Sequence, residues 1–198
     1  MTKNALCFAM ALGSVVAHAS VVTPVEFTIQ STILTNGSNI SACGIRFVGA
    51  TSTPDGKFVD LVDGSFMFTD QVYYAVKAGH FRKKVGDPAE TPKRGDIAWI
   101  KIGKSSNVVP HSPSMQAETK GYKLFVAKID EGALAIDGIY AKERLWVAFA
   151  DSKGLTSVYS GKLNIDDMTM VQFSECMSDV TQRVQKALEA SPTPEAKR

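Results

Sequence analysis

The sequence has few cysteines, little net charge and no long hydrophobic segment after its first residues, and each shortage excludes a class of protein. Three cysteines among 198 residues are too few for a small scaffold built on several disulfides. A formal net charge of +2 gives no large field to attract nucleic acid or an anionic membrane, so we expect no nucleic-acid partner. No later segment is long and apolar enough to predict a transmembrane helix.

The first nineteen residues have the pattern of a cleavable signal peptide. Lys3 supplies the positive start, residues 5–16 are apolar or small, and Ala17-His18-Ala19 has the small-x-small form that signal peptidase cleaves. The alternative is a buried N-terminal helix, which Gly13 disfavours. We therefore expect a signal peptide over 1–19, cleavage near Ala19, and a periplasmic or secreted product.

The cysteines support an exported protein. Removal of the leader with Cys7 leaves Cys43 and Cys176, which can form one disulfide in an oxidising compartment. Two unpaired buried thiols are the alternative. The disulfide hypothesis also removes the strongest nucleophiles from a search for catalytic residues.

Most of the chain after the leader shows the two-residue alternation of β-strands. Turn-forming pairs such as Asn36-Gly37 and Asp63-Gly64 separate the segments. No long amphipathic segments separate the strands, so we predict a mainly β domain over 20–190, an antiparallel β-sandwich or barrel-like fold of about 8–10 strands. The expected strands include 26–34, 43–51, 58–62, 65–69, 72–78, 97–102, 122–129, 145–150 and 156–163, with a weaker apolar segment at 133–140.

Two long polar segments interrupt this pattern. Residues 80–95 contain prolines and five basic residues, and residues 103–121 contain Pro110 and Pro113. We interpret both as exposed loops, which in a compact domain are often functional.

The pattern becomes helical near the C-terminus. From 167 to 189 the apolar residues recur at steps of three and four, as on one face of an α-helix, and Cys176 lies on that face. Asn164 or Asp166 is the expected N-cap. A disulfide to Cys43 would join this helix to the sheet, and the proline-containing segment 191–198 is expected to be a disordered tail.

Candidate binding residues come from the two polar segments. Their basic side chains could contact an acidic partner or a headgroup, although Asp87 and Glu90 dilute the charge and a solvated loop is the favoured interpretation. The candidates are His80, Arg82, Lys83, Lys84, Lys93, Arg94 and His111.

The sequence contains no motif for a metal or a cofactor, and we expect neither. His80 and His111 lack metal-ligand spacing and are expected to be surface residues. Asp55, Asp60 and Asp63 do not match a calcium loop, and Asp60 is expected to face solvent. The tryptophan and tyrosine side chains of the predicted strands, Tyr159 among them, are expected to pack in the core rather than stack on sugars.

Function follows only as ranked hypotheses. The first is an exported, non-enzymatic binding or envelope-assembly protein, because catalytic motifs are missing and two polar loops project from the scaffold. An unpaired apolar edge strand would favour the assembly form of this hypothesis. The alternative is a small periplasmic hydrolase that uses His80 or His111, since a catalytic triad is assembled in space and leaves no sequence pattern.

Overall fold

The structure is a computed structural model that describes residues 22–93, 95–104, 107–110, 114–151, 154 and 156–190. Within these residues it contains eleven strands and two helices. The strands are β1 (Val22–Pro24), β2 (Glu26–Asn36), β3 (Asn39–Ser52), β4 (Phe58–Thr69), β5 (Tyr74–Lys84), β6 (Glu90–Pro92), β7 (Asp96–Ile102), β8 (Met115–Gln116), β9 (Tyr122–Ala127), β10 (Arg144–Ala150) and β11 (Thr156–Asn164). The helices are α1 (Ile129–Tyr140) and α2 (Asp167–Ala190).

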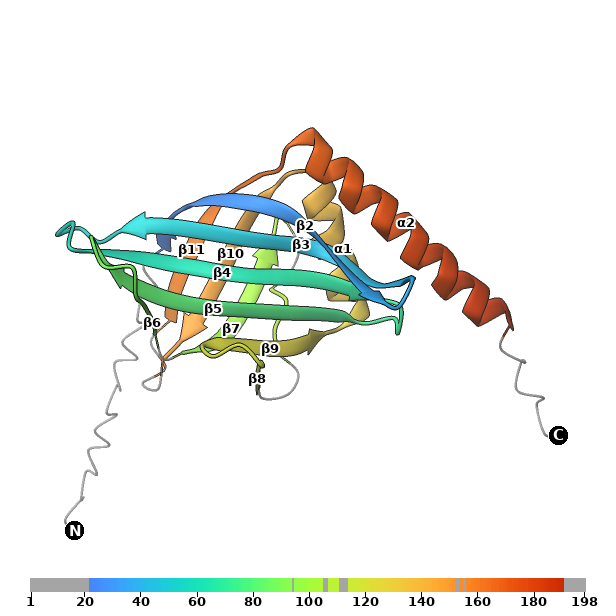
Figure 1. Cartoon of the computed structure of the whole chain (residues 1–198), viewed down its shortest axis with the longest axis horizontal. Helices are drawn as coiled ribbons and strands as arrows, with labels where there is room; N and C mark the ends of the chain where they lie inside the picture. Colours follow the sequence, from blue (N-terminus) through green and yellow to red (C-terminus); the bar gives the residue numbers. More distant parts are fainter. Residues whose placement is uncertain are drawn as a thin grey trace, which may run out of the picture.

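All the strands belong to one curled sheet. Its order is β7-β10-β11-β2-β3-β4-β5-β9-β8, with β1 paired to β11 and β6 paired to β5. Neighbours are antiparallel except for the parallel pairs β1–β11 and β11–β2. Figure 1 shows the sheet curling until β7, β10 and β11 lie behind β3–β5, which makes a half-barrel. The predicted mainly β fold is confirmed in its barrel-like form.

Side-chain alternation explains why the curled sheet has a buried inner face. Ile29 of β2 lies opposite Phe47 of β3, and Ile45 lies opposite Phe66 of β4, so apolar residues of neighbouring strands form continuous rows. All four side chains are buried in the core. The two-residue period predicted for 26–34 and 43–51 therefore marks the side of each strand that faces the inside of the half-barrel.

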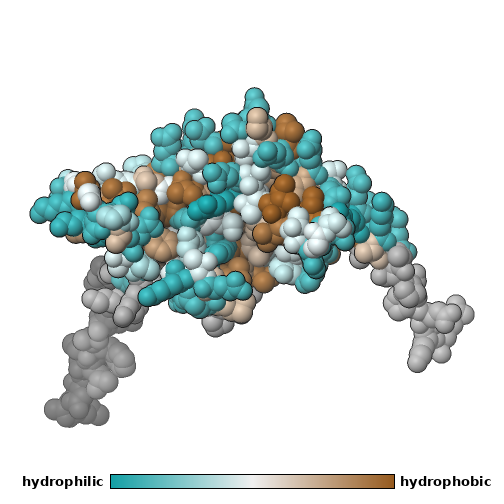
Figure 2. Space-filling model, viewed as in Figure 1, coloured by the Kyte–Doolittle hydropathy of each residue, from teal (hydrophilic) through white to brown (hydrophobic). Residues whose placement is uncertain are grey.

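The outer face of the same strands carries charged and apolar side chains together. Arg46 donates two hydrogen bonds to Asp63, at 3.0 and 2.7 Å, and the Tyr122 hydroxyl donates a third at 2.6 Å. Figure 2 shows this face, where hydrophilic side chains separate smaller hydrophobic groups. Both carboxylate oxygens of Asp63 therefore accept hydrogen bonds on the outer face of the sheet.

Helix α1 was not predicted. Residues 133–140 look like a weak strand in the sequence, but they belong to a helix that buries Ala135, Ile136 and Ile139. Gly132 and Gly138 hide the helical pattern, because glycine is a poor helix former. A Cβ atom on Gly132 would overlap the Tyr74 ring, so close packing requires glycine there. The helix packs between β5 and β7 rather than standing free.

The predicted loop over 80–95 is wrong for much of its length. β5 continues to Lys84, and the short strand β6 pairs with β5 at Phe81, Arg82 and Lys83. The sequence did not reveal this part of the strand, because Arg82, Lys83 and Lys84 are consecutive charged residues and show no two-residue apolar alternation. The second predicted loop, 103–121, contains only the two-residue strand β8 and an isolated bridge between Val108 and Ile100 in its described residues.

The C-terminal helix and the disulfide are confirmed. α2 spans Asp167–Ala190, and the Asp166 carboxylate accepts a hydrogen bond of 2.7 Å from the backbone N–H of Thr169, which makes Asp166 the N-cap. Cys176 of α2 is bonded to Cys43 of β3, with their Cα atoms 5.8 Å apart. Because Cys43 lies on the inner face of β3, the start of the helix packs on that face against β2 and β3. Figure 1 shows the rest of α2 running beyond the ends of these strands. Neither helix of the described chain is long and apolar enough to cross a membrane.

Candidate ligand site at the mouth of the half-barrel

A buried polar cluster interrupts the apolar inner face near one end of the half-barrel. His80 of β5 follows Val76 and Ala78 on the inner face of its strand, and only 5% of it is exposed. Its Nε2 atom shares a hydrogen bond of 2.7 Å with the hydroxyl of Tyr159 on β11. The His80 ring also contacts Phe149 of β10, with centroids 5.3 Å apart. The curl of the sheet places these side chains face to face, because β5 and β11 are not neighbours.

Asp60 connects this pair to two cations. The carboxylate accepts hydrogen bonds from Arg82 at 2.7 and 2.8 Å, while the Lys93 ammonium lies 3.8 Å and the His80 ring nitrogen 3.9 Å from it. Burial by itself would raise the pKa of Asp60, but the Arg82 hydrogen bonds and the nearby cations outweigh it and hold the pKa below its ordinary value. Asp60 is therefore ionised at neutral pH. The prediction that it faces solvent is wrong, since only 9% of the residue is exposed.

His80 is neutral at neutral pH. Burial, aided by the charge of Lys93, lowers its pKa to about 4, although Asp60 opposes the shift. Burial likewise raises the pKa of Tyr159, so the phenol keeps its proton. The hydrogen bond thus joins two uncharged groups, and the expectation that His80 is an ordinary surface histidine is wrong.

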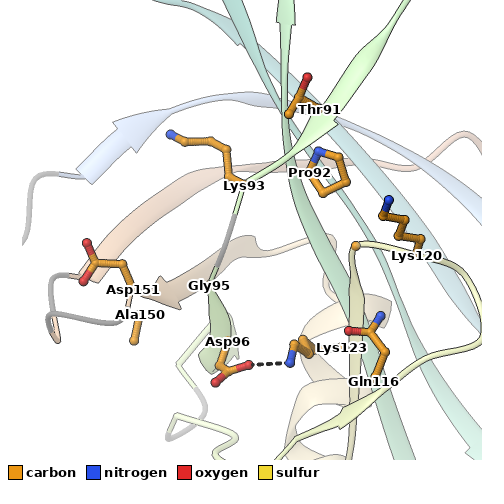
Figure 3. Close-up of a pocket in the computed structure, with 11 residues that line it drawn as sticks. Thr91, Pro92, Lys93, Gly95, Asp96, Gln116, Lys120, Lys123, Ala150 and Asp151 are labelled. Carbon is orange, nitrogen blue, oxygen red and sulfur yellow. Dashed lines mark ion pairs between the residues drawn. The ribbon is translucent and has the colours of Figure 1, made fainter.

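A cavity of about 670 Å³ opens beside this cluster at the mouth of the half-barrel. Its wall comes from three parts of the chain: the segment around β6 and the start of β7, the β8–β9 connection, and the end of β10. Figure 3 shows how these segments surround the space. The lining residues are Thr91, Pro92, Lys93, Gly95, Asp96, Gln116, Lys120, Gly121, Lys123, Ala150 and Asp151.

The charges of the cavity wall are partly paired. The Lys123 ammonium lies 3.0 Å from the Asp96 carboxylate, which also accepts a hydrogen bond of 3.4 Å from Ser114. Lys93 lines the cavity and also faces Asp60, so it links the cavity to the buried cluster. Burial lowers the pKa of Lys93, and the neighbouring Asp60 carboxylate opposes that shift. The wall can hold a polar or anionic group while the stems of its lysines and Pro92 offer apolar contact.

The structure brings some of the candidate binding residues together and places others elsewhere. His80, Arg82 and Lys93 meet at Asp60. Lys83 alternates to the opposite face of β5, beside Val59 and Glu90, and Lys84 is exposed at the end of the strand. Arg94 and His111 lie outside the described residues, as does the predicted signal peptide over 1–19. The four basic residues of this segment that the structure describes therefore do not form one patch.

Several residues of the cavity wall could not be predicted from the sequence. Lys120, Lys123 and Gln116 carry no pattern that distinguishes them from other polar residues. The alternation Val76, Ala78, His80 and Arg82 could have placed His80 on the inner face, had the strand been extended beyond residue 78.

The three aspartates weighed for calcium do not converge. Asp60 lies on the inner face of β4, Asp63 lies on the outer face of the same strand, and Asp55 accepts hydrogen bonds from Thr53 and Lys57 in the β3–β4 turn. Among the described residues, no group of three or more potential ligands could hold a metal ion.

The hydrolase alternative stays a hypothesis. In the described chain the polar side chains around His80 are Tyr159, Asp60, Arg82 and Lys93, and no serine hydroxyl forms a hydrogen bond with it. A serine nucleophile needs such a base within hydrogen-bond reach.

Comparison of the chain with protein-family models, with curated proteins and with solved structures gave no match. The disulfide between Cys43 and Cys176 fits an exported protein that folds in an oxidising compartment.

Proposed function

We propose that the chain is an exported, non-enzymatic binding protein whose small ligand occupies the mouth cavity. The observation that carries this proposal is the cavity itself, about 670 Å³ in volume and lined by Lys93, Gln116 and Lys120. Cavities of roughly 300–1,000 Å³ with a few convergent polar groups are the usual size of small-molecule sites. The mouth of a β-barrel is a common place for such a site.

The scaffold supports binding because strands fix most of the cavity wall. Thr91 and Pro92 belong to β6, Asp96 opens β7, and Ala150 ends β10, so these positions are held by the sheet. The signal-peptide pattern of residues 1–19 and the disulfide support export. Together they support a binding protein of the periplasm or the extracellular medium.

Ligand binding at the cavity can be tested with an NMR fragment screen on the folded chain. We expect fragments to shift the amide signals of Gly95, Gly121 and Gln116, and we expect Ala150→Trp to abolish these shifts because the indole would fill the cavity. Ala133→Trp is the matched control, because Ala133 is exposed on α1 and does not line the cavity. Fragments that bind elsewhere, or that bind the Ala150→Trp variant equally well, would contradict the proposal.

Envelope assembly is a second candidate function, favoured by the edge of the sheet at β9. β8 pairs only with Lys123 and Leu124, and within the described chain no strand pairs with Phe125–Ala127 on the side away from β5. Val126 is 43% exposed and Met115 is 57% exposed on this edge. Exposed apolar edges recruit strands from other chains.

A photocrosslinking amino acid at Val126 tests the assembly function in the intact cell envelope. We expect a crosslinked product of one defined mass, mapped to one segment of one partner, because strand addition places a fixed neighbour beside Val126. The same photocrosslinker at Ala133 should give no such product. Equal products at both positions, or none at Val126, would rule out this edge as an assembly site.

A further inference from the structure

We propose that the ligand of the mouth cavity is a small organic anion, whose carboxylate or phosphate group is attracted by the positive charges that Lys93 and Lys120 bring to the wall. The inference rests on the proposed function of the cavity and names the chemical class of its ligand. Its basis is the balance of charges along the cavity wall and beneath it.

Two acids, one in the cavity wall and one beneath it, are already engaged. Asp96 lies 3.0 Å from the Lys123 ammonium, and this pair is neutral as a unit. Asp60, beneath the cavity, accepts two hydrogen bonds from Arg82, so its charge is balanced before Lys93 is counted. The Lys93 ammonium lies 3.8 Å from Asp60, beyond hydrogen-bond distance, and is a surplus cation in this cluster.

Lys120 adds a second surplus cation. It lines the cavity from the β8–β9 connection, and no ion pair joins it to an acid in the described part of the chain. Asp151 is the remaining acid of the wall. Once the Lys123–Asp96 pair is set aside, the described wall carries two lysines, Lys93 and Lys120, and one carboxylate, and therefore an excess of positive charge. Figure 3 shows the two lysines extending from different segments of the wall.

The neighbouring histidine does not change this balance. His80 is buried and uncharged, and its Nε2 atom is occupied by the Tyr159 hydroxyl. The cluster therefore presents one net positive charge to the cavity, through Lys93, rather than two. An anion at the cavity would complete the pairing of Lys93 that Asp60 provides only in part.

The volume of the cavity indicates an organic anion. About 670 Å³ is many times the roughly 30 Å³ that one water molecule occupies. An inorganic ion would fill only a small part of it. Pro92, Ala150 and the methylene groups of the lysines supply apolar surface that a carbon skeleton can contact. A ligand with an anionic group and a small carbon skeleton matches both the charge and the size.

Calorimetry with charged and neutral forms of the same skeleton tests the inference. The probes are citrate with trimethyl citrate, and glucose 6-phosphate with glucose. We expect at least one anion to bind, its neutral form to bind roughly tenfold more weakly or not at all, and high salt to weaken the anion. Binding of citrate alone identifies a carboxylate ligand, and binding of glucose 6-phosphate alone identifies a phosphate ligand.

Charge-removing variants locate the anion. Lys93→Gln and Lys120→Gln should each weaken binding, and the double variant should weaken it by at least roughly tenfold. Lys101→Gln is the matched control, because Lys101 lies over the Trp146 ring, does not line the cavity and should leave binding unchanged. Folding of each variant is checked by circular dichroism.

The possible failures are distinguishable. Neutral forms that bind as well as the anions, or binding that survives the double lysine variant, would overturn the anion inference and leave the cavity as a ligand site. If no anion binds but fragments still shift the cavity amides, the anion inference is likewise overturned and the cavity stays a ligand site. Absence of both anion and fragment binding would overturn the inference and the proposed function together.

Discussion

At the scale of single residues, the most informative group is His80. Its neighbours in the sequence suggest an exposed basic loop, yet strand pairing carries the ring into the core. Burial keeps the imidazole neutral, and Tyr159 satisfies one of its nitrogens. Because a neutral buried histidine resists protonation, the site couples the stability of the fold to pH.

Stability is expected to fall as the pH falls from 6.5 towards 4. The folded-state pKa of His80 is lowered to about 4 from the ordinary 6.5, so over this interval the unfolded chain binds a proton that the folded chain does not. The linkage amounts to roughly 3 kcal/mol. Asp60 acts in a separate window, because its lowered pKa costs stability only below its ordinary value of 3.8.

Urea denaturation at several pH values tests this linkage. His80→Gln should lose most of the dependence between pH 6.5 and 4, since glutamine does not titrate. Tyr159→Phe should keep it, because burial is the main cause of the low pKa. An unchanged slope in His80→Gln would show that another group is responsible.

At the scale of the elements, the two helices are similarly amphipathic, but the sequence predicts only α2. The buried face of α2 can be recognised in the sequence, because Phe173, Met177 and Val180 recur at helical spacing. The buried face of α1 cannot be recognised in the sequence, because two of its positions are glycines. Gly132 packs against Tyr74, and Gly138 packs against Ile102. Tertiary packing, rather than helix propensity, selects glycine at these positions.

The disulfide is expected to hold α2 against the sheet. In Cys43→Ala/Cys176→Ala the free energy of unfolding should fall by roughly 3–5 kcal/mol, because the bridge closes a long loop of the unfolded chain. Hydrogen exchange should show α2 opening first, while β3 and β4 keep their protection in the centre of the sheet.

Reduction of the wild-type protein should reproduce the hydrogen-exchange pattern of the double alanine variant. If α2 keeps full amide protection without the bridge, then Phe173, Met177 and Val180 hold the helix by packing alone. Simultaneous loss of protection in α2 and the central strands would instead show that the two form one cooperative unit.

At the scale of the whole molecule, the curl of the sheet brings together the segments that make the site. β5 and β11 are separated by three strands in the sheet order, yet His80 and Tyr159 meet across the interior. The cavity wall likewise combines β6, the β8–β9 connection and the end of β10. A flat sheet of the same strands would hold these groups far apart.

The strands of clear alternation, the C-terminal helix and the pairing of Cys43 with Cys176 could all be predicted from the residues alone. Strand and helix periods are local patterns, and with Cys7 assigned to the predicted leader the remaining two cysteines have one possible pairing. The half-barrel, the helix α1, the burial of Asp60 and His80, and the cavity became visible only in the folded chain. These features depend on strand register, sheet curl and close packing between distant residues, for which one sequence carries no local signal.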